Sequence, residues 1–189
     1  MTRIHRPHLL GIDDGPFEKG RDEHTPIVGV LMEGQDLVEA VALTEFPVDG
    51  ADPAEFLTDW IAGLRFVSGL HGIVLGGITI AGLGIVDTAL LSEKLNLPVM
   101  VVNRHAPTND RLNEALNAAG LAARIAIVER APAAWELDRG LWVSHVGTSR
   151  VEAERLLRAA RGKSLLPEPL RLAHLIGGAV ATGHSRGRP

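Results

Sequence analysis

The hydrophobic pattern of this chain changes its period near residue 52, and this change restricts the fold more than any other feature. Before that point, three apolar runs at residues 8–12, 27–32 and 37–46 are closed by turn-forming residues. Runs of this length with such turns favour β-strands joined as antiparallel hairpins with short connections. After that point, apolar residues recur at the spacing of a helix. They are Phe56, Leu57, Trp60, Ile61 and Leu64.

The rest of the chain alternates between buried-type strands and capped helices. The first helix is predicted to begin at Asp52-Pro53-Ala54-Glu55, where an N-cap residue precedes proline and a glutamate follows three positions after the cap. Further strands are predicted at residues 72–75, 97–102, 124–128 and 141–144. Further helices are predicted up to about residue 96, from Thr108 to about residue 119, from the capping box Ser149-Arg150-Val151-Glu152, and from Pro167-Glu168-Pro169.

This order of elements predicts an α/β fold with a mixed sheet. Three antiparallel strands come first, and right-handed βα units then add a parallel portion flanked by helices. That arrangement is a ribonuclease H-like sheet. The length of 189 residues suits one domain over residues 1–189, with a loose tail from about residue 184.

Composition excludes several classes of protein. The chain has no cysteine, so disulfides and thiolate metal sites are excluded. No apolar run reaches the roughly 18 residues that span a bilayer, and the start lacks the apolar stretch of a secretory signal, so we expect a cytoplasmic protein without a membrane partner. The sequence does not determine the oligomeric state.

Short motifs in a fixed order resemble an uncharacterised microbial family of endonuclease V-like proteins. The opening motif is Gly11-Ile12-Asp13-Asp14-Gly15-Pro16-Phe17. The resemblance continues at 77–82, at Leu97-Pro98-Val99, at 167–174 and at the ending Ser185-Arg186-Gly187-Arg188. Endonuclease V itself shares the aspartate that ends the first strand and the Pro-Glu-Pro segment. Each motif alone is weak, but their order covers nearly the whole chain.

The resemblance implies a set of site residues for phosphodiester cleavage. It makes Asp13 and His174 catalytic residues, with Asp13 also a metal ligand and His174 near the metal on the last helix. The second carboxylate corresponds to Asp49 or Asp52, and the sequence does not decide between them. The third is an aspartate of an Asp-Gly pair, which reads Gly76-Gly77 here. Because this carboxylate is missing, we expect the nuclease activity that the resemblance implies to be weakened or lost.

The chemistry that the resemblance implies needs a divalent metal. Mg²⁺ or Mn²⁺ would activate a water and relieve the negative charge of the phosphate. Mg²⁺ prefers oxygen ligands, so Asp13 and Asp52 are candidate ligands. Asp14 is a candidate to compensate for the missing carboxylate, although neighbouring residues on a strand point to opposite faces.

Contact with nucleic acid is expected to be weak. The formal net charge is −4, whereas proteins that bind duplex DNA usually present a basic face. Arg171, Arg186 and Arg188 are the candidate contacts. Tyrosine is absent from the chain, whereas the endonuclease V loop that wedges into the duplex contains one.

Each candidate residue also has an ordinary structural interpretation. Asp13-Asp14-Gly15 has the composition of a turn, and Asp52 that of a helix cap. His174 follows Leu170 by one helical turn, which favours a hydrogen-bonded residue of the core. Arg171 is equally suited to pair with a carboxylate.

The alternative function is a non-catalytic nucleotide or small-molecule binding protein that uses the turn from Gly76 to Gly84. Glycine-rich turns bind phosphates through backbone N–H groups. The segment Gly82-Leu83-Gly84 is followed by Asp87 where a dinucleotide fingerprint has its third glycine. We therefore interpret these glycines mainly as allowing close approach of strand and helix.

Overall fold

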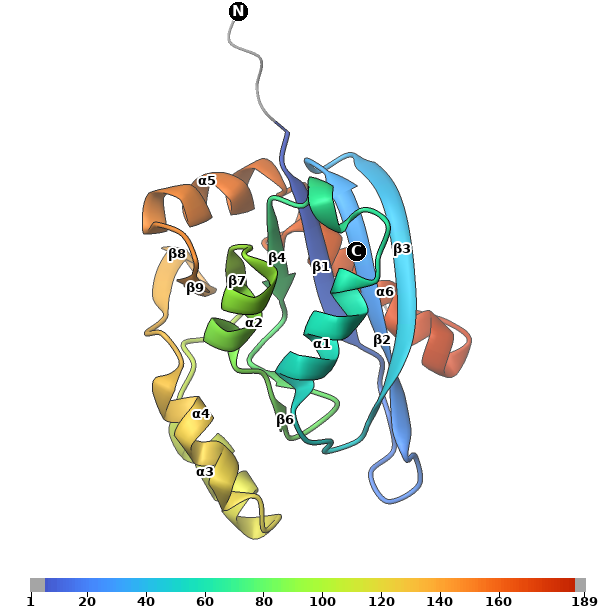
Figure 1. The fold of residues 1–189 in the computed structure, drawn as a ribbon, viewed down its shortest axis with the longest axis vertical. Helices are drawn as coiled ribbons and strands as arrows, with labels where there is room; N and C mark the ends of the chain where they lie inside the picture. Colours follow the sequence, from blue (N-terminus) through green and yellow to red (C-terminus); the bar gives the residue numbers. More distant parts are fainter. Residues whose placement is uncertain (1–5, 186–189) are drawn as a thin grey trace, which may run out of the picture.

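The computed structural model describes residues 6–185, which form a seven-stranded sheet in the order β3-β2-β1-β4-β7-β9-β8 with a separate small hairpin (Figure 1). The strands of the sheet are β1 (His8–Asp14), β2 (His24–Glu33), β3 (Leu37–Pro47), β4 (Gly72–Leu75), β7 (Val99–Asn103), β8 (Trp135–Asp138) and β9 (Leu141–Val146). The candidate contacts Arg186 and Arg188, and the tail beyond Ser185, lie outside the described residues.

Strand directions confirm the predicted mixed sheet. β1, β2 and β3 pair as antiparallel neighbours, and β4 and β7 then add in parallel to β1. β9 returns antiparallel to β7, so the parallel portion ends there. The connection between β1 and β2 spans residues 15–23 and is longer than the short turn expected there.

Burial explains why the central strands read as continuous apolar runs. All four residues of β4 are buried, as are the first four of β7, because helices cover both faces of the sheet. At the edge, β3 is largely exposed, apart from Phe46. The apolar run of β3 does not indicate burial, because Leu37, Val41 and Leu43 are exposed there.

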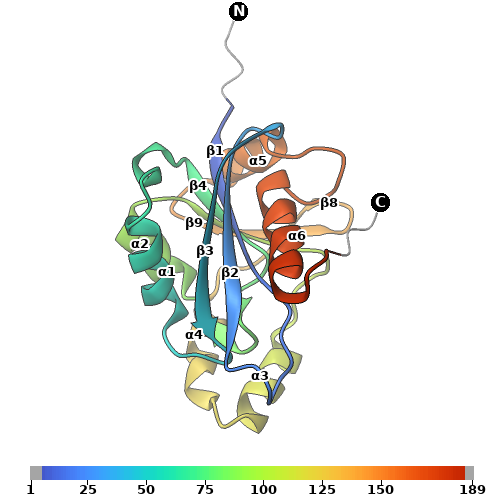
Figure 2. The same ribbon diagram turned by 90° about the vertical axis from the view of Figure 1, so that its right-hand side faces the viewer.

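Helices form one layer on each face of the sheet (Figures 1 and 2). α1 (Pro53–Ala62) and α2 (Thr88–Leu95) pack on one face, and α5 (Arg150–Ala159) and α6 (Glu168–Thr182) pack on the other. The first interface includes Leu57, Ile61 and Leu91, and the second includes Leu156, Leu157 and Leu170. Among residues 6–185, no helix has both the length and the apolar character needed to cross a membrane.

The prediction of a strand at residues 124–128 is wrong. A 3-10 turn (Ala122–Arg124) and helix α4 (Ile125–Arg130) occupy this segment and pack beside α3 (Asn109–Ala118). The β-branched residues favour a strand, but both edges of β7 are already paired, with β4 and β9. Val128 instead packs with Leu116 and Ile85 in a separate small core.

Two elements were not predicted from the sequence. The glycine-rich turn folds into a hairpin of β5 (Thr79–Ile80) and β6 (Gly84–Ile85), whose strands are too short for a periodic signal. β8 precedes β9 and pairs with it across a bulge, so its alternation is interrupted.

Helix starts follow the predicted positions, but among the described residues the side chains of two predicted caps, Asp52 and Thr108, make no capping bond. The Ser149 side chain accepts a hydrogen bond from the Glu152 backbone, as the capping box predicts. Asp52 precedes α1 as expected, yet its side chain makes no capping bond within the described structure. Its backbone is left-handed, with φ 51°, instead of extended as N-cap residues usually are. The expected role of Asp52 as a side-chain cap is therefore wrong.

Candidate functional site

Three parallel strands end at the same edge of the sheet, and their last residues form the candidate site. β1 ends in Asp13-Asp14, β4 is followed by Gly76, and β7 ends in Asn103. Carboxyl ends of parallel strands are where open α/β sheets bind their ligands. The strand order therefore brings together residues that are about 90 positions apart in the sequence.

Asp13 and His174 meet at this edge, as the resemblance implies. His174 Nδ1 of α6 lies 2.8 Å from Asp13 Oδ2. The His174 side chain is 66% exposed, so its interpretation as a core residue is wrong. Leu170, one turn earlier, is buried, and α6 carries His174 past the end of β1 to the surface.

The contact between Gly11 and the start of α6 sets this geometry. A Cβ atom at position 11 would lie 2.5 Å from Pro169 O and closer still to the Leu170 nitrogen. The backbone of α6 therefore approaches β1 closely because residue 11 has no side chain. The Gly11-Ile12-Asp13 motif and the Pro-Glu-Pro motif thus contact each other. The contact is at Gly11, two residues before Asp13 on β1.

Asp14 points away from Asp13, as strand alternation predicts. Its Oδ2 accepts a hydrogen bond of 2.7 Å from the Ala81 backbone in the β5–β6 turn. Burial, together with the negative charge of Asp13, raises the pKa of the Asp14 carboxyl above its ordinary value. The two carboxylates are therefore close enough to interact although they lie on different faces of the strand.

His174 is expected to titrate above the ordinary histidine value. Its hydrogen bond to Asp13 raises the pKa of the imidazole, against the opposing effect of partial burial. Because the folded-state pKa is raised, the contribution of this pair to the free energy of unfolding is complete below about pH 6.5. That contribution is lost as pH rises through the raised pKa.

Proton NMR of the metal-free protein measures the midpoint of the His174 titration, and His174→Gln assigns the signal. We expect Asp13→Asn to lower that midpoint, and an unchanged midpoint would contradict the pairing.

Asp49, the other candidate for the second carboxylate, has a structural role, because it binds the turn of the β5–β6 hairpin. Its Oδ1 accepts from the Leu83 backbone at 2.8 Å, and its Oδ2 lies 3.0 Å from Lys19 Nζ. Burial opposes ionisation of Asp49, but these two partners together lower its pKa. Asp49 therefore links the β5–β6 turn to the segment that follows β3.

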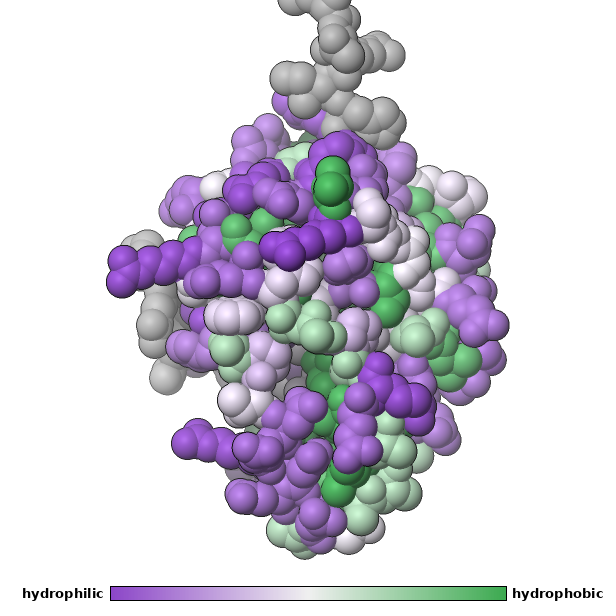
Figure 3. All heavy atoms as spheres, turned by 90° about the vertical axis from the view of Figure 1, so that its left-hand side faces the viewer, coloured by the Kyte–Doolittle hydropathy of each residue, from purple (hydrophilic) through white to green (hydrophobic). Residues whose placement is uncertain are grey.

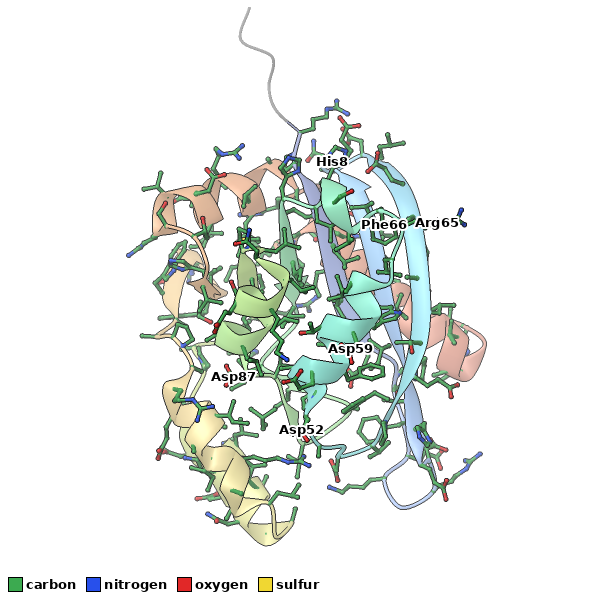
Figure 4. All side chains as sticks on the ribbon, in the orientation of Figure 1. His8, Asp52, Asp59, Arg65, Phe66 and Asp87 are labelled. Atoms are coloured by element: carbon green, nitrogen blue, oxygen red, sulfur yellow. The ribbon has the colours of Figure 1, made fainter. Side chains whose placement is uncertain are left out.

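Asp52 lies at the lower end of α1 (Figure 4). Neither Asp49 nor Asp52 is among the described residues that line the cavities around Asp13. The structure therefore does not bring a second carboxylate from this segment beside Asp13.

Gly76, the position of the missing aspartate, adjoins Asp13, as expected for the ends of neighbouring strands. A Cβ atom at Gly76 would lie 3.2 Å from Asp13 Oδ1. Gly76 itself is outside the left-handed region, and the glycine that needs its conformational freedom is Gly77, with φ 148°. A larger residue at position 76 is therefore compatible with the backbone.

The backbone donors of the glycine-rich turn are engaged within the protein. The Ala81 and Leu83 N–H groups donate to Asp14 and Asp49, respectively. Asp87 caps α2 through the Leu90 N–H and pairs with Arg130 at 2.7 Å (Figure 4). Two of the backbone groups that could bind a phosphate in the alternative function are thus already occupied by carboxylates.

Arg171 pairs with a carboxylate, which was the ordinary interpretation of this residue. Its Nη2 lies 2.6 Å from Oε2 of the buried Glu168 in the Pro-Glu-Pro motif. This ion pair holds the guanidinium against the first turn of α6. Its availability to a phosphate depends on breaking a partly buried contact.

A cleft of about 760 Å³ opens beside the Asp13–His174 pair. Its wall includes Asp14, Phe17 and Thr182. A second cavity of about 350 Å³ continues from Asp13 toward Asn103 and Arg104. Sequence reasoning missed Asn103 and Arg104. Their place directly after a buried strand was the available signal.

A second group of potential metal ligands lies at the opposite end of β1. Among residues 6–185, His8, Glu33 and Glu39 are the group of three whose ligand atoms lie within 4.8 Å of one another. His8 Nε2 lies 3.3 Å from Glu39 Oε2. His8 starts β1, whereas Asp13 lies near its end, so this group is separate from the candidate site (Figure 4).

Known proteins resemble this chain over most of its length. The model of a family described as endonuclease dU matches residues 5–181. A UPF0215 protein of Methanothermobacter thermautotrophicus is 35% identical over 183 residues, which cover 95% of this chain and 90% of that protein.

Solved structures with the same fold support this grouping. A protein of unknown function from Archaeoglobus fulgidus has a TM-score of 0.85 and 30% identity, covering 93% of this chain and 98% of its own. Endonuclease V of Ciona intestinalis, solved with a 24mer DNA containing an inosine, has a TM-score of 0.59 and 11% identity, covering 92% of this chain and 84% of its own. The fold is therefore that of endonuclease V, a ribonuclease H-like sheet, as predicted.

Proposed function

Because this chain belongs to the endonuclease dU family, we propose that it is a divalent-metal-dependent endonuclease that cuts a phosphodiester bond of nucleic acid beside Asp13 and His174. The family description names dU, which we take as deoxyuridine in DNA. DNA as the polymer is also supported by the inosine-containing DNA bound to the Ciona endonuclease V.

One observation carries this proposal. A carboxylate and an imidazole from segments 161 residues apart are in contact at 2.8 Å, at the ends of parallel strands and beside an open cleft. An exposed ion pair of this kind adds little to stability. Its position at a ligand-binding edge supports a role in chemistry.

The residues present fit a weakly held Mg²⁺ or Mn²⁺ ion. Asp13 Oδ1 faces the space left by Gly76, and Asp14 lines the same cleft with its Oδ2 engaged by the Ala81 N–H. Both ions prefer such oxygen ligands, and a bound ion would supply a nucleophilic water and neutralise phosphate charge. With two carboxylates, we expect Mg²⁺ affinity in the millimolar range.

The side chains around the cleft have complementary roles. Asp13 holds His174 in place and favours its protonated form. A protonated His174 would donate a proton to the leaving oxygen or contact a phosphate oxygen. Arg104 lines the adjoining cavity with Asp13 and His174 and adds a second positive charge there. Both cations suit a phosphate group.

Binding to duplex DNA is expected to be weak and sensitive to salt. The net charge is −4, so long-range attraction to the phosphate backbone is small. Fluorescence anisotropy with a labelled duplex at physiological salt measures this affinity. A submicromolar dissociation constant under those conditions would contradict the expectation.

Cleavage of defined oligonucleotides tests the proposed function. Single-stranded and duplex DNA containing one deoxyuridine, one inosine or neither is incubated with the protein and Mg²⁺, Mn²⁺ or EDTA. We expect metal-dependent cuts near deoxyuridine. Intact substrates under every condition, with protein whose folding is verified by circular dichroism, would reject the proposal.

A further inference from the structure

A separate cavity of about 360 Å³ lies beside the candidate site, on the sheet between β7 and β9. Its floor is made of two cross-strand pairs, Asn103 with Trp142 and Val101 with Ser144. Paired residues of this kind lie side by side on one face of a sheet. The indole and the amide are therefore neighbours on the same surface.

The walls of this cavity come from two loops, at residues 106–109 and 131–134. They contribute alanine, proline and the side chain of Asn109. Among the described residues, none that lines the cavity carries a charge. Figure 3 shows this side of the molecule, where pale side chains separate the hydrophilic surface of α5 from the α3–α4 region. Such a lining suits a neutral, planar ligand with a few hydrogen-bonding groups.

Asn103 is common to this cavity and the candidate site, because it also lines the cavity that contains Asp13 and His174. Gly76 lies beside Asp13, and Gly77 lies beside Asn103. A Cβ atom would lie 3.2 Å from Asp13 Oδ1 at the first glycine and 3.9 Å from Asn103 Oδ1 at the second. Two consecutive residues without side chains therefore leave space beside Asp13 and beside Asn103.

The next residue along the chain turns toward the other site. Arg104 lines the cavity with Asp13 and His174 but is not among the residues around Trp142. Asn103 and Arg104 thus direct an amide toward one cavity and a cation toward the other, on opposite faces of the sheet at the end of β7. A nucleotide has the same order of groups, with a neutral base next to an anionic phosphate.

We propose that this cavity, the Asn103–Trp142 pocket, receives one nucleobase turned out of a DNA strand whose phosphate lies at Asp13, His174 and Arg104. This inference rests on the proposed function, and the family description makes uracil the expected base. The Trp142 ring offers a surface for stacking, and the Asn103 amide offers an adjacent donor and acceptor. Enzymes that act on a single base commonly hold it in such a pocket outside the helix.

A cycle of binding measurements tests the pocket without requiring cleavage. Affinities of the full chain in EDTA are measured for single-stranded DNA with one central deoxyuridine and for the same strand with an abasic analogue there. We expect the abasic strand to bind about tenfold more weakly to the wild type. The difference should fall below about twofold in Asn103→Leu and in Trp142→Leu, because these changes remove the contacts to the base.

Three further variants separate the pocket from general effects. Trp142→Phe keeps an aromatic face and should retain most of the difference, as should Trp135→Phe, which lies outside the pocket. Arg104→Gln should weaken both strands equally, because it acts on phosphate. Melting temperatures verify that each variant is folded.

The outcomes distinguish the two proposals. Equal affinity of the wild type for both strands, or an unchanged difference in folded Asn103→Leu and Trp142→Leu, would overturn the pocket even if the protein cuts DNA. A difference that these variants abolish would support the pocket even if no cleavage is found, in which case only the nuclease proposal fails.

Discussion

The Gly11→Ala variant is expected to be less stable than the wild-type chain by about 3 kcal/mol. The added methyl group would meet backbone atoms of Pro169 and Leu170, which cannot move as a flexible side chain does. The start of α6 must therefore shift away from β1. Unfolding in urea, followed by circular dichroism, measures the change in the free energy of unfolding.

Gly69→Ala is the matched control for this variant. A Cβ atom at Gly69 meets nothing within 4 Å, and its backbone is not left-handed. We expect its free energy of unfolding to stay within about 0.5 kcal/mol of the wild type. A Gly11→Ala protein as stable as this control would show that α6 does not need the close approach to β1.

Gly76→Asp is expected to strengthen Mn²⁺ binding at least tenfold, as an order of magnitude for one added charged ligand. The new carboxylate would lie beside Asp13 Oδ1, and position 76 has a backbone that aspartate tolerates. Calorimetry with Mn²⁺ measures the affinity. The melting temperature is recorded first, because the new Cβ is close to both Asp13 and Leu170.

The control for charge is Gly76→Asn, which has nearly the same shape without the negative charge. We expect it to bind Mn²⁺ more weakly than Gly76→Asp. A folded Gly76→Asp protein with unchanged Mn²⁺ affinity would contradict the idea that Gly76 marks a lost ligand. It would instead favour the requirement for open space between Asp13 and Asn103.

Much of the fold could be predicted because its signals are local. The apolar runs of β1, β4 and β7, the cap of α5 and the proline start of α6 are readable from periodicity and from single residues. The segment 124–128 misled the prediction because β-branched residues suit either a strand or a helix, and the neighbours available for packing decide. The left-handed Asp52 similarly depends on a turn that the sequence does not specify.

The candidate site was predictable only where a motif marks it. Asp13 and His174 were found through resemblance, and the structure confirms their contact. Asn103, Arg104 and Trp142 carry no local motif. The pairing of β7 with β4 brings Asn103 and Arg104 to the site, and the pairing of β7 with β9 brings Trp142 beside Asn103. That pairing is antiparallel, whereas periodicity alone predicted further parallel units.

Metal-dependent cleavage by Asp13→Asn, compared with the wild type and with Asp52→Asn, tests the central claim most directly. The substrate is single-stranded DNA containing one deoxyuridine, in Mn²⁺. Asp13→Asn removes the charged carboxylate that holds His174 and faces Gly76, so we expect the rate to fall about 100-fold or more, a typical effect of a group that acts on the reacting centre. Asp52→Asn, outside the cavities around Asp13, should cleave at the wild-type rate. Cleavage that survives in a folded Asp13→Asn protein would contradict the account.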